Sequence, residues 1–522
     1  MAQSIVGTNL STNAAAISRK PCVELLIAWG YDADDTVTWA TDGEDESARI
    51  LNIQWGRELN IDSSMGVGRG TAATLTVTLD NRDQRYSPHN ESGALWDRLT
   101  TTATTPGGET VDYPRFFMTP VRVRAGYYDG ATAEYVTVFV GYIDQVDETY
   151  GVAGDTVTIK CLDRASKLVQ RRASTAVKVN WRTDKWLNYI ANGFGDMSPV
   201  TAKIDAGLFV IPYAWLDDEK LWDEVQQAAA SEGGYAFFDE VGDFTFHNAL
   251  WWATSTYSIA PNVEFTTAKF TEVSPGYDWR DVATGAIVEY QARWSGGEQV
   301  LWEKKQTTVV PPGGTTVEAR YRYPSTVAYP PVFETDWLPI NAGGVIFAND
   351  EVTVSLENQQ AQRCTVTFTN NTHETAFVSS IRIRGSAIVG GPNEEIERNV
   401  TSPLVPENKV RVAANPYVQT KPQAELLADL LADRMRYPRL IYRINGVKAL
   451  PWLQLGDKIT VTANDVLTDS RTAIITALAF TWAPEARFAM NVSAVDSAGL
   501  YPYTSFFVIG TSELGGAAVI YR

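Results

Sequence analysis

Three oxygen-bearing side chains, Asp80, Asn81 and Asp83, stand together directly after the segment Ala73–Leu79. Carboxylate and amide oxygens are ligands of Ca²⁺, so this group is a candidate cation site. The twelve-residue EF-hand loop requires a glycine at its sixth position, where this chain has Arg85. Asx side chains also hydrogen-bond to nearby backbone and favour turns. We therefore interpret the group as turn chemistry and assign no metal ligand to it.

A larger acidic group brackets the apolar stretch Val37–Trp39. Its members are Asp32, Asp34, Asp35, Asp42, Glu44, Asp45 and Glu46. Runs of like charge repel one another and are usually solvated. We interpret this group as a solvated hairpin loop, with metal binding as the alternative.

The three histidines of the chain, His89, His247 and His373, are far apart in the sequence. None has a cysteine or histidine at zinc-ligand spacing, which argues against a histidine-based zinc site. A Ser-His-Asp triad is spatial and spacing does not exclude it, but no G-x-S-x-G elbow supports one. We expect surface or hydrogen-bonded structural histidines, and we assign no catalytic, cofactor-binding or metal residue.

The remaining candidates have simpler explanations. The glycine-rich stretch Gly66–Gly70 lacks the helix and the G-K-[ST] ending of a phosphate cradle, so we interpret it as a flexible turn. A glycosidase carboxylate pair cannot be selected among 62 acidic residues. Several tryptophans could stack on sugars, but core or interface packing is the favoured interpretation. These are Trp251, Trp252, Trp279, Trp294 and Trp302.

Composition excludes several classes of protein. The 522 residues carry a net charge of −18 without a run of basic residues, which argues against gripping nucleic acid through phosphates. The acidity indicates either solubility or a wall past which DNA slides, and the sequence does not separate the two. Cys22, Cys161 and Cys364 are few and distant, so we expect no disulfide framework, consistent with a reducing cytoplasm. We find neither a secretory signal nor an apolar run of about 18 residues.

Period-two alternation dominates the chain and predicts a mainly β fold. Eight segments carry it most clearly: Ala73–Leu79, Tyr135–Tyr142, Thr156–Leu162, Ala286–Trp294, Glu351–Leu356, Cys364–Thr369, Asp457–Thr462 and Phe488–Val495.

Helices are predicted at only a few places. The segment Glu219–Gly233 has an apolar stripe, with Asp217 or Asp218 as its N-cap and Gly233 and Gly234 as its stop. In the segment Thr420–Arg436, Thr420 and Gln423 form a potential capping box and Pro438 closes the helix. Shorter helices are predicted over Arg164–Arg171 and Asp184–Asn192.

Composition changes near 172–183, 261–280 and 390–420, and a chain of this length is expected to form several domains. We predict four: 1–172, a β-barrel; 173–275, α+β; 276–404, a small β-sandwich that can interleave with the second; and 405–522, a second β-barrel with a C-terminal extension. The fold class is therefore mainly β with some α+β, in which two barrels flank an α+β insert and a sandwich.

The segment Ala72–Pro88 (AATLTVTLDNRDQRYSP) resembles the minor tail and hub proteins of long-tailed bacteriophages, in which a strand runs into LDNRDGRYSP. Here Gln84 replaces the glycine that would supply a positive φ freely, so we expect the turn geometry to be affected first at Gln84. Further segments resemble these proteins in the same order along the chain. They are Gly141–Asp144 with Thr156–Leu168, Leu221–Asn248, Asp350–Gly385, Leu450–Val461 with its LQLGD step, and Phe506–Gly515 (FFVIGTSELG). The last resembles proteins of actinobacterial phages.

The resemblance implies a structural protein without catalysis. It implies a homotrimer in which each chain donates two tail-tube-like barrels, so that six barrels match a six-fold tube. It also implies partners: the distal tail or tail-tube protein, the tape-measure protein, and receptor-binding or fibre proteins. Phage DNA would pass transiently without specific binding, and the protein would be assembled in the host cytoplasm and reside at the distal end of the virion's tail. No cofactor and no membrane span are implied. The alternatives are a tail-associated cell-wall hydrolase and a receptor- or glycan-binding module near 250–345.

Overall fold

The computed structural model describes residues 5, 8–16, 18–61, 68–152, 154–195, 203–251, 263–266, 271–277, 282–321, 327–329, 334–348, 350–400, 407–438, 440–462, 470–484 and 487–496. Strands account for most of this part of the chain, and its helices are few and short. The predicted mainly β class with some α+β is confirmed, and each of the eight predicted strand segments lies in or overlaps a strand. The C-terminal motif Phe506–Gly515 lies outside the described residues.

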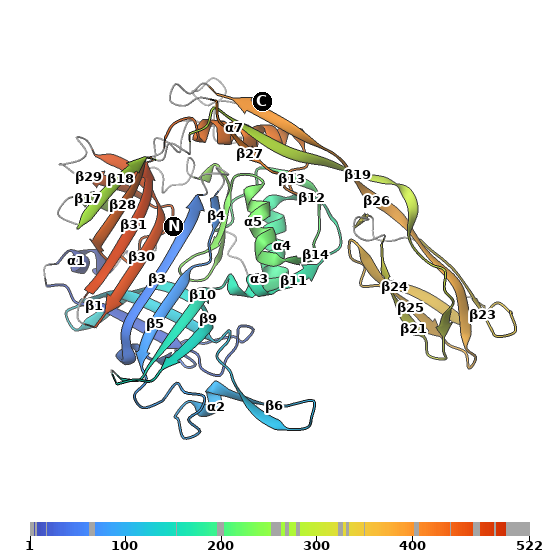
Figure 1. Cartoon of the computed structure of the whole chain (residues 1–522), viewed down its shortest axis with the longest axis horizontal. Coiled ribbons are helices and arrows are strands. Elements are labelled where there is room, and N and C mark those ends of the chain that lie inside the picture. Colours follow the sequence, from blue (N-terminus) through green and yellow to red (C-terminus); the bar gives the residue numbers. More distant parts are fainter. Residues whose placement is uncertain are drawn as a thin grey trace.

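Fourteen strands form one large curved sheet, on the left of Figure 1. Its path is β18 (Glu272–Tyr277), β28 (Leu440–Lys448), β31 (Arg487–Asp496), β30 (Arg471–Ala483), β3 (Ile50–Ile61), β5 (Thr74–Asp80), β10 (Thr156–Asp163), β9 (Thr132–Thr149), β8 (Pro120–Asp129), β1 (Pro21–Ile27) and β2 (Glu44–Asp45). Off this path, β29 (Lys458–Thr462) pairs with β30 and β17 (Val263–Thr266), and β4 (Gly68–Gly70) pairs with β3. Almost all pairs are antiparallel, so the sheet can bury one face while the other meets water.

Strand β5 shows how the sequence pattern becomes a core. Leu75, Val77 and Leu79 are at most 1% exposed and face the main hydrophobic cluster. The intervening threonines remain partly exposed on the opposite face, as alternation at period two requires. The same cluster contains apolar residues of β1, β8, β30 and β31, so one core serves both the early and the late strands.

Early and late parts of the chain meet at one strand pair. Strand β3 pairs with β30 antiparallel, from Ile53 opposite Trp482 to Glu58 opposite Ala477. Strands β17 and β18, from the middle of the chain, pair with β29 and β28. The two β regions that the sequence places early and late therefore share one continuous sheet. The predicted domain limits at 172, 275 and 404 stay a prediction.

A mixed α/β unit lies beside the sheet, at the centre of Figure 1. Its elements are α3 (Ser166–Gln170), β11 (Arg172–Ser174), β12 (Lys178–Arg182), α4 (Thr183–Gly195), β13 (Val210–Ala214), β14 (Asp217–Lys220), α5 (Leu221–Ala230), β15 (Tyr235–Phe238) and β16 (Phe244–His247). Strands β15 and β16 form a hairpin whose turn contains Gly242 at φ +83°. The predicted cap of α5 is wrong: Asp217 and Asp218 lie in β14, which pairs with β11, and Lys220 is the N-cap.

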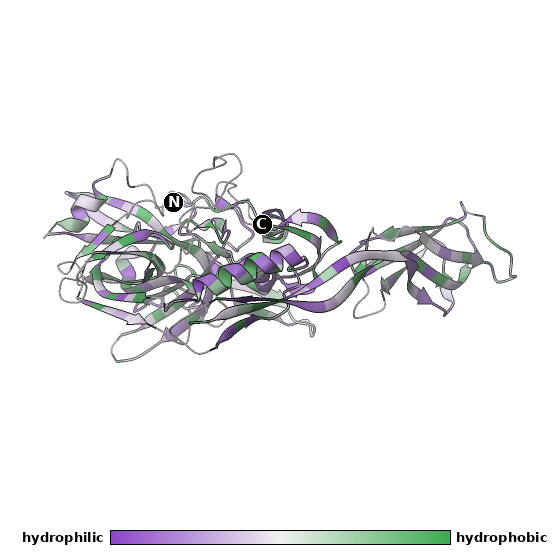
Figure 2. Ribbon diagram, turned by 90° about the horizontal axis from the view of Figure 1, so that it is seen from above, coloured by the Kyte–Doolittle hydropathy of each residue, from purple (hydrophilic) through white to green (hydrophobic). Residues whose placement is uncertain are grey.

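A long arm extends from the body in both ribbon views (Figures 1 and 2). Its stem consists of the antiparallel strands β19 (Gly285–Lys304) and β26 (Ala376–Asn399). These carry β20 (Thr308–Val310), β22 (Val327–Ala328), β23 (Glu334–Ile340) and β27 (Lys409–Val412). A second sheet of β21 (Thr315–Arg320), β25 (Arg363–Asn370) and β24 (Val352–Glu357) packs against them around its own apolar core, which gives the predicted sandwich.

Helix α7 (Lys421–Arg434) packs on the base of the arm through Leu427, Leu431 and Ala424. Thr420 is its N-cap but makes no side-chain capping bond. The Gln423 side chain instead accepts a hydrogen bond from the backbone N–H of Gln419, at 3.2 Å. The predicted helix is confirmed. The predicted capping box is wrong, because Gln423 bonds to Gln419, the residue before the N-cap, and not to Thr420.

The remaining elements are short. They are α1 (Leu10–Ala15), the 3₁₀ turn η1 (Ser47–Arg49), α2 (Trp96–Leu99), β6 (Thr100–Thr104) and β7 (Thr110–Pro114), of which the last two form an isolated hairpin. All three cysteines, Cys22, Cys161 and Cys364, are buried and free. Among the described helices, none combines the length and apolar character that a membrane crossing demands.

Candidate functional site

The corner after β5 forms around the segment that first suggested chemistry. The backbone N–H of Asn81 donates to the carbonyl of Asp155 at 2.9 Å, and its Oδ1 accepts from the N–H of Tyr86 at 3.0 Å. Gln84 adopts φ +53°, the left-handed region that favours glycine. The turn thus keeps the geometry that glycine would adopt freely, with an L-residue in its place.

The carboxylates of this corner are paired with arginines. Asp83 accepts two hydrogen bonds from Arg49, at 2.8 and 2.7 Å, and Arg82 binds Asp80 two residues away. Hydrogen bonds from Arg82 lower the pKa of Asp80, and those from Arg49 lower the pKa of Asp83. Throughout the described ranges, no group of three or more His, Cys, Asp or Glu residues is arranged to hold a metal ion. These are the interactions of a structural turn.

Beneath the corner lies Glu46, which is only 3% exposed. Its carboxylate accepts hydrogen bonds from Trp29 Nε1 at 3.1 Å, from the Tyr86 hydroxyl at 2.6 Å and from Arg85 at 3.1 Å. The burial of Tyr86 and the adjacent Glu46 charge raise the pKa of that hydroxyl. The expectation of a solvated acidic loop is therefore wrong for Glu46, which joins the corner to the β1 edge as a buried and well-satisfied charge.

The histidines do not come together. His89 and His373 are exposed, whereas His247 stacks on Trp251 with ring centroids 3.9 Å apart. The Nδ1 atom of His247 lies 3.2 Å from Asp205, and burial lowers the pKa of the imidazole. His247 is thus a hydrogen-bonded structural histidine.

The other sequence candidates are dispersed. Of the glycine-rich stretch, Gly68–Gly70 forms β4, and 66–67 lie outside the described residues. Gly70 donates its N–H to Gln226 at 3.0 Å, and a side chain there would collide with the Ala236 carbonyl. Trp251 is buried and Trp302 packs against the arm core, while Trp294 is 47% exposed. Trp252 and Trp279 lie outside the described part of the chain.

A buried ion pair that the sequence analysis missed joins three regions of the chain. Arg57 on β3 lies 2.8 Å from Glu240 in the β15–β16 turn, and both side chains are about 95% buried. Arg57 also donates to the Val138 carbonyl at 3.2 Å, and Gln454 donates to Glu240. A signal for this site existed, because Arg57 interrupts the inward face that Trp55 and Leu59 otherwise make apolar. The partner was not predictable, since it is 183 residues away.

Two further carboxyls are buried: Asp163 at the end of β10 and Glu232 after α5. Asp163 accepts hydrogen bonds from the N–H groups of Ala73 and Ala165, at 2.7 and 2.9 Å, yet burial raises its pKa to about 7. Burial raises the pKa of Glu232 to about 8. Its Oε2 accepts from the Leu208 N–H at 2.9 Å, and its Oε1 has no hydrogen-bond partner among the described residues. The printed partners of both carboxylates are backbone N–H groups, so we interpret the two groups as structural.

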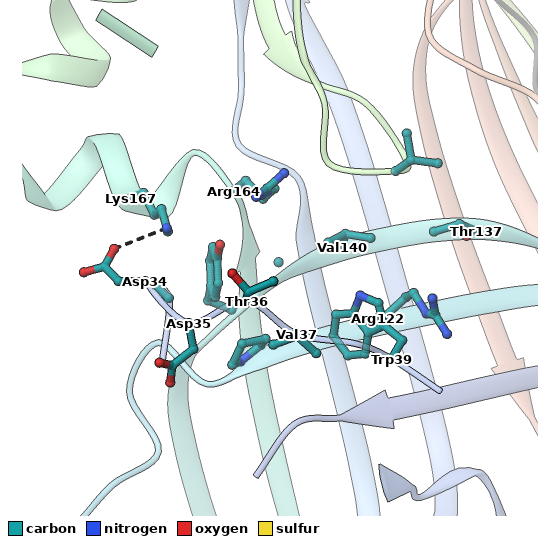
Figure 3. Close-up of a pocket in the computed structure, with 15 residues that line it drawn as sticks. Asp34, Asp35, Thr36, Val37, Trp39, Arg122, Thr137, Val140, Arg164 and Lys167 are labelled. Carbon is teal, nitrogen blue, oxygen red and sulfur yellow. Dashed lines mark hydrogen bonds and ion pairs between the residues drawn. The ribbon is translucent and has the colours of Figure 1, made fainter. Parts of the chain in front are cut away.

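One pocket of about 490 Å³ opens between the β1–β2 loop, the outer face of β8 and β9, and the start of α3 (Figure 3). Three cationic and two acidic side chains line it: Arg122, Arg164, Lys167, Asp34 and Asp35. Lys167 Nζ lies 3.3 Å from Asp34, which Arg171 also contacts at 2.7 Å. Although desolvation opposes it, the hydrogen bond from Lys167 and the charge of Arg171 lower the pKa of Asp34.

Solved structures of phage tail proteins are similar to this chain. A tail protein from Neisseria meningitidis MC58 is 9% identical, with a TM-score of 0.47, and the match covers 91% of this chain and 96% of that one. The 43 kDa tail protein of prophage MuSo2 from Shewanella oneidensis is 11% identical, with a TM-score of 0.46 and coverages of 92% and 99%. A prophage tail protein from Listeria monocytogenes EGD-e is 9% identical, with a TM-score of 0.40 and coverages of 90% and 94%.

The sequence comparisons give no family. No protein-family model matches the chain, and no curated protein matches it.

Proposed function

We propose that this chain is a structural hub at the tail tip of a long-tailed bacteriophage. The observation that carries the proposal is the β3–β30 pairing, which unites two widely separated tail-like motifs in one sheet. The LDNRDQRYSP corner follows β5, the neighbour of β3, and the LQLGD step precedes β29, the neighbour of β30. A single sheet that is built from both halves of the chain suits a structural position in a tail tube.

In this proposal three copies form a ring that caps the tail tube and continues its channel. Such rings close through large heterologous interfaces. The ring would contact the distal tail or tail-tube protein and the tape-measure protein, and fibre or receptor-binding proteins outside. The protein would reside in the virion at the distal end of the tail and gate DNA ejection without specific DNA binding, as its net charge of −18 favours.

The proposal keeps the four-part division at 172, 275 and 404, with the sheet running across it, and an actinobacterial host. It places the Asp80–Pro88 corner near a subunit boundary. No catalysis is assigned, and the cell-wall hydrolase remains the alternative that a zymogram on host walls would reveal.

A second candidate, glycan binding by the arm, is favoured by one observation. Trp294 on β19 is 47% exposed, and its ring packs over Gly391 on β26, where a side chain would come within 3.2 Å. Flat exposed indoles are suited to stacking on sugars. Binding of the whole protein to host glycans that is lost in Trp294→Ala would support this function.

Mass photometry and cryo-EM class averages of the purified protein test the hub directly. The expected result is a trimer with a central pore or plug. A protein that stays monomeric at high concentration, and also after addition of its tail-tube and tape-measure neighbours, would contradict the proposal.

A further inference from the structure

Two arginines on β8, Arg122 and Arg124, differ in whether a carboxylate pairs with them. They are two residues apart on the same face of the sheet, and each guanidinium lies over an aromatic ring, at 4.9 Å from the Trp39 centroid and 5.1 Å from that of Tyr135. Arg124 also forms a bidentate ion pair with Glu24. Within the described part of the chain, the buried Nε of Arg122 has no hydrogen-bond acceptor.

The surroundings of Arg122 leave its charge under-compensated. Burial lowers the pKa of its guanidinium, the adjacent Arg124 lowers it further, and Glu24, which opposes this, is engaged by Arg124. A half-buried cation whose buried Nε lacks an acceptor is costly, because water no longer solvates that N–H group. Arg124 shows that the same strand and face accommodate a paired arginine.

Arg122 lines the pocket of Figure 3, where Arg164 is a second cation. The Nη1 of Arg164 donates to the Gly242 carbonyl at 3.2 Å, which holds the side chain at the rim. The acidic residues of the pocket are already engaged: Asp34 by Lys167 and Arg171, and Asp35 by the backbone N–H of Asp32 at 2.8 Å. Three cationic against two acidic side chains leave the lining with one net positive charge, in a protein whose net charge is −18.

The same pocket offers apolar walls. Val37, Val140 and Val241 come from three different elements and line it together with the rings of Trp39 and Tyr142. A ligand that fits needs an anionic head for the arginines and an apolar body for these walls. Its head must be planar to match the fork of a guanidinium that already stacks on an indole.

We propose that this pocket binds an organic carboxylate attached to an apolar body. Arg122 holds the carboxylate, Arg164 adds a second positive charge to the same lining, and the valines and Trp39 contact the body. The carboxylate belongs either to a free small acid or to an acidic side chain flanked by apolar residues in a peptide. The site is independent of the proposed tail function, since its chemistry is complete within one chain.

Isothermal titration calorimetry with 3-phenylpropionate and its neutral counterpart 3-phenylpropionamide tests the site on the full-length protein. The acid is expected to bind and the amide to bind at least about tenfold more weakly, because only the acid gains charge-assisted hydrogen bonds. Arg122→Gln should weaken binding of the acid by about tenfold or more. Arg82→Gln, which removes a 75% exposed arginine that does not line the pocket, is the control and should leave it unchanged.

Two peptides distinguish the sources of the carboxylate: N-acetyl-Phe-Glu-Phe-amide and the same peptide with Gln. If the Glu peptide binds more tightly than 3-phenylpropionate and loses affinity in Arg122→Gln, the natural ligand is an acidic peptide. If the free acid binds more tightly, the ligand is a small acid. Equal binding of acid and amide, or equal losses in the two arginine variants, would overturn the proposal. The acid–amide comparison on the unaltered protein remains decisive even where Arg122→Gln folds poorly.

Discussion

The indole of Trp55 stacks on the phenyl ring of Phe480, with centroids 5.0 Å apart and ring planes within 10° of parallel. The two residues face each other across the β3–β30 pair, 425 positions apart in the chain. Each is 4% exposed, and Phe488 of β31 packs against Trp55 from the side, at 5.9 Å. This aromatic cluster packs across the strand pair that joins the early and late parts of the chain into one sheet.

Trp55→Ala is expected to destabilise the protein by about 3–5 kcal/mol, because it removes a buried indole and leaves a cavity at the strand pair. Chemical denaturation measures the loss of stability. Hydrogen exchange should locate it in the amides of β3 and β30. Leu51→Ala on the same strand is the control, since Leu51 is 44% exposed and its truncation should cost less than about 0.5 kcal/mol. Unchanged exchange in β30 would show that the pair does not depend on this contact.

The Arg57–Glu240 pair should behave as a buried ion pair. Arg57→Met leaves Glu240 as an unpaired buried charge, which is expected to cost about 3–5 kcal/mol. In the double variant Arg57→Met with Glu240→Leu, no charge remains, so most of that stability should return. Denaturation of both variants measures the recovery. If the double variant is as unstable as the single one, packing and not the unpaired charge limits stability at this junction.

Gln84→Gly is expected to stabilise the corner by up to about 1 kcal/mol. Gln84 has φ +53°, its side chain is exposed, and it hydrogen-bonds to Asn81, Ser87 and Asn90 through its backbone atoms. Glycine relieves the left-handed strain, although the greater freedom of the unfolded chain offsets part of the gain. Gln84→Ala retains the strain and should change little. A thermal unfolding series that ranks the glycine variant below the alanine variant would contradict this expectation.

Glu232→Gln is expected to alter how stability depends on pH. Burial raises the pKa of Glu232 from 4.5 to about 8, so between these values the folded state binds more protons than the unfolded state. The contribution of a raised pKa is fully present below the unfolded value and is lost as pH rises through the folded value. Between about pH 5 and 8 the free energy of unfolding of the wild type should therefore fall by up to about 1.4 kcal/mol per pH unit more than that of the variant.

Urea denaturation from pH 5 to pH 8 measures how the free energy of unfolding changes with pH in the wild type and in Glu232→Gln. Asp163, whose pKa burial raises to about 7, contributes in the same direction in both proteins and cancels in the comparison. Glu91→Gln, at an exposed position, is the control and should leave the slope unchanged. Parallel curves for wild type and Glu232→Gln would mean that Glu232 is ionised in the folded protein.

Local patterns were sufficient to predict the elements. Alternation in the Thr156–Leu162 segment predicted β10, and the apolar stripe after Glu219 predicted α5, because burial on one face imposes a period on the sequence. Caps were less predictable. Asp217 and Asp218 have suitable side chains, but pairing of β14 with β11 engages their backbone before the helix begins.

The sequence by itself determined the mainly β class, the positions of eight strand segments and the two longer predicted helices. Only the tertiary structure decided that β3 pairs with β30, that Glu46 is buried beneath Tyr86, and that Arg57 meets Glu240. The physical reason is that periodicity is a local property, whereas strand partners and buried charge pairs depend on which distant segments share a core.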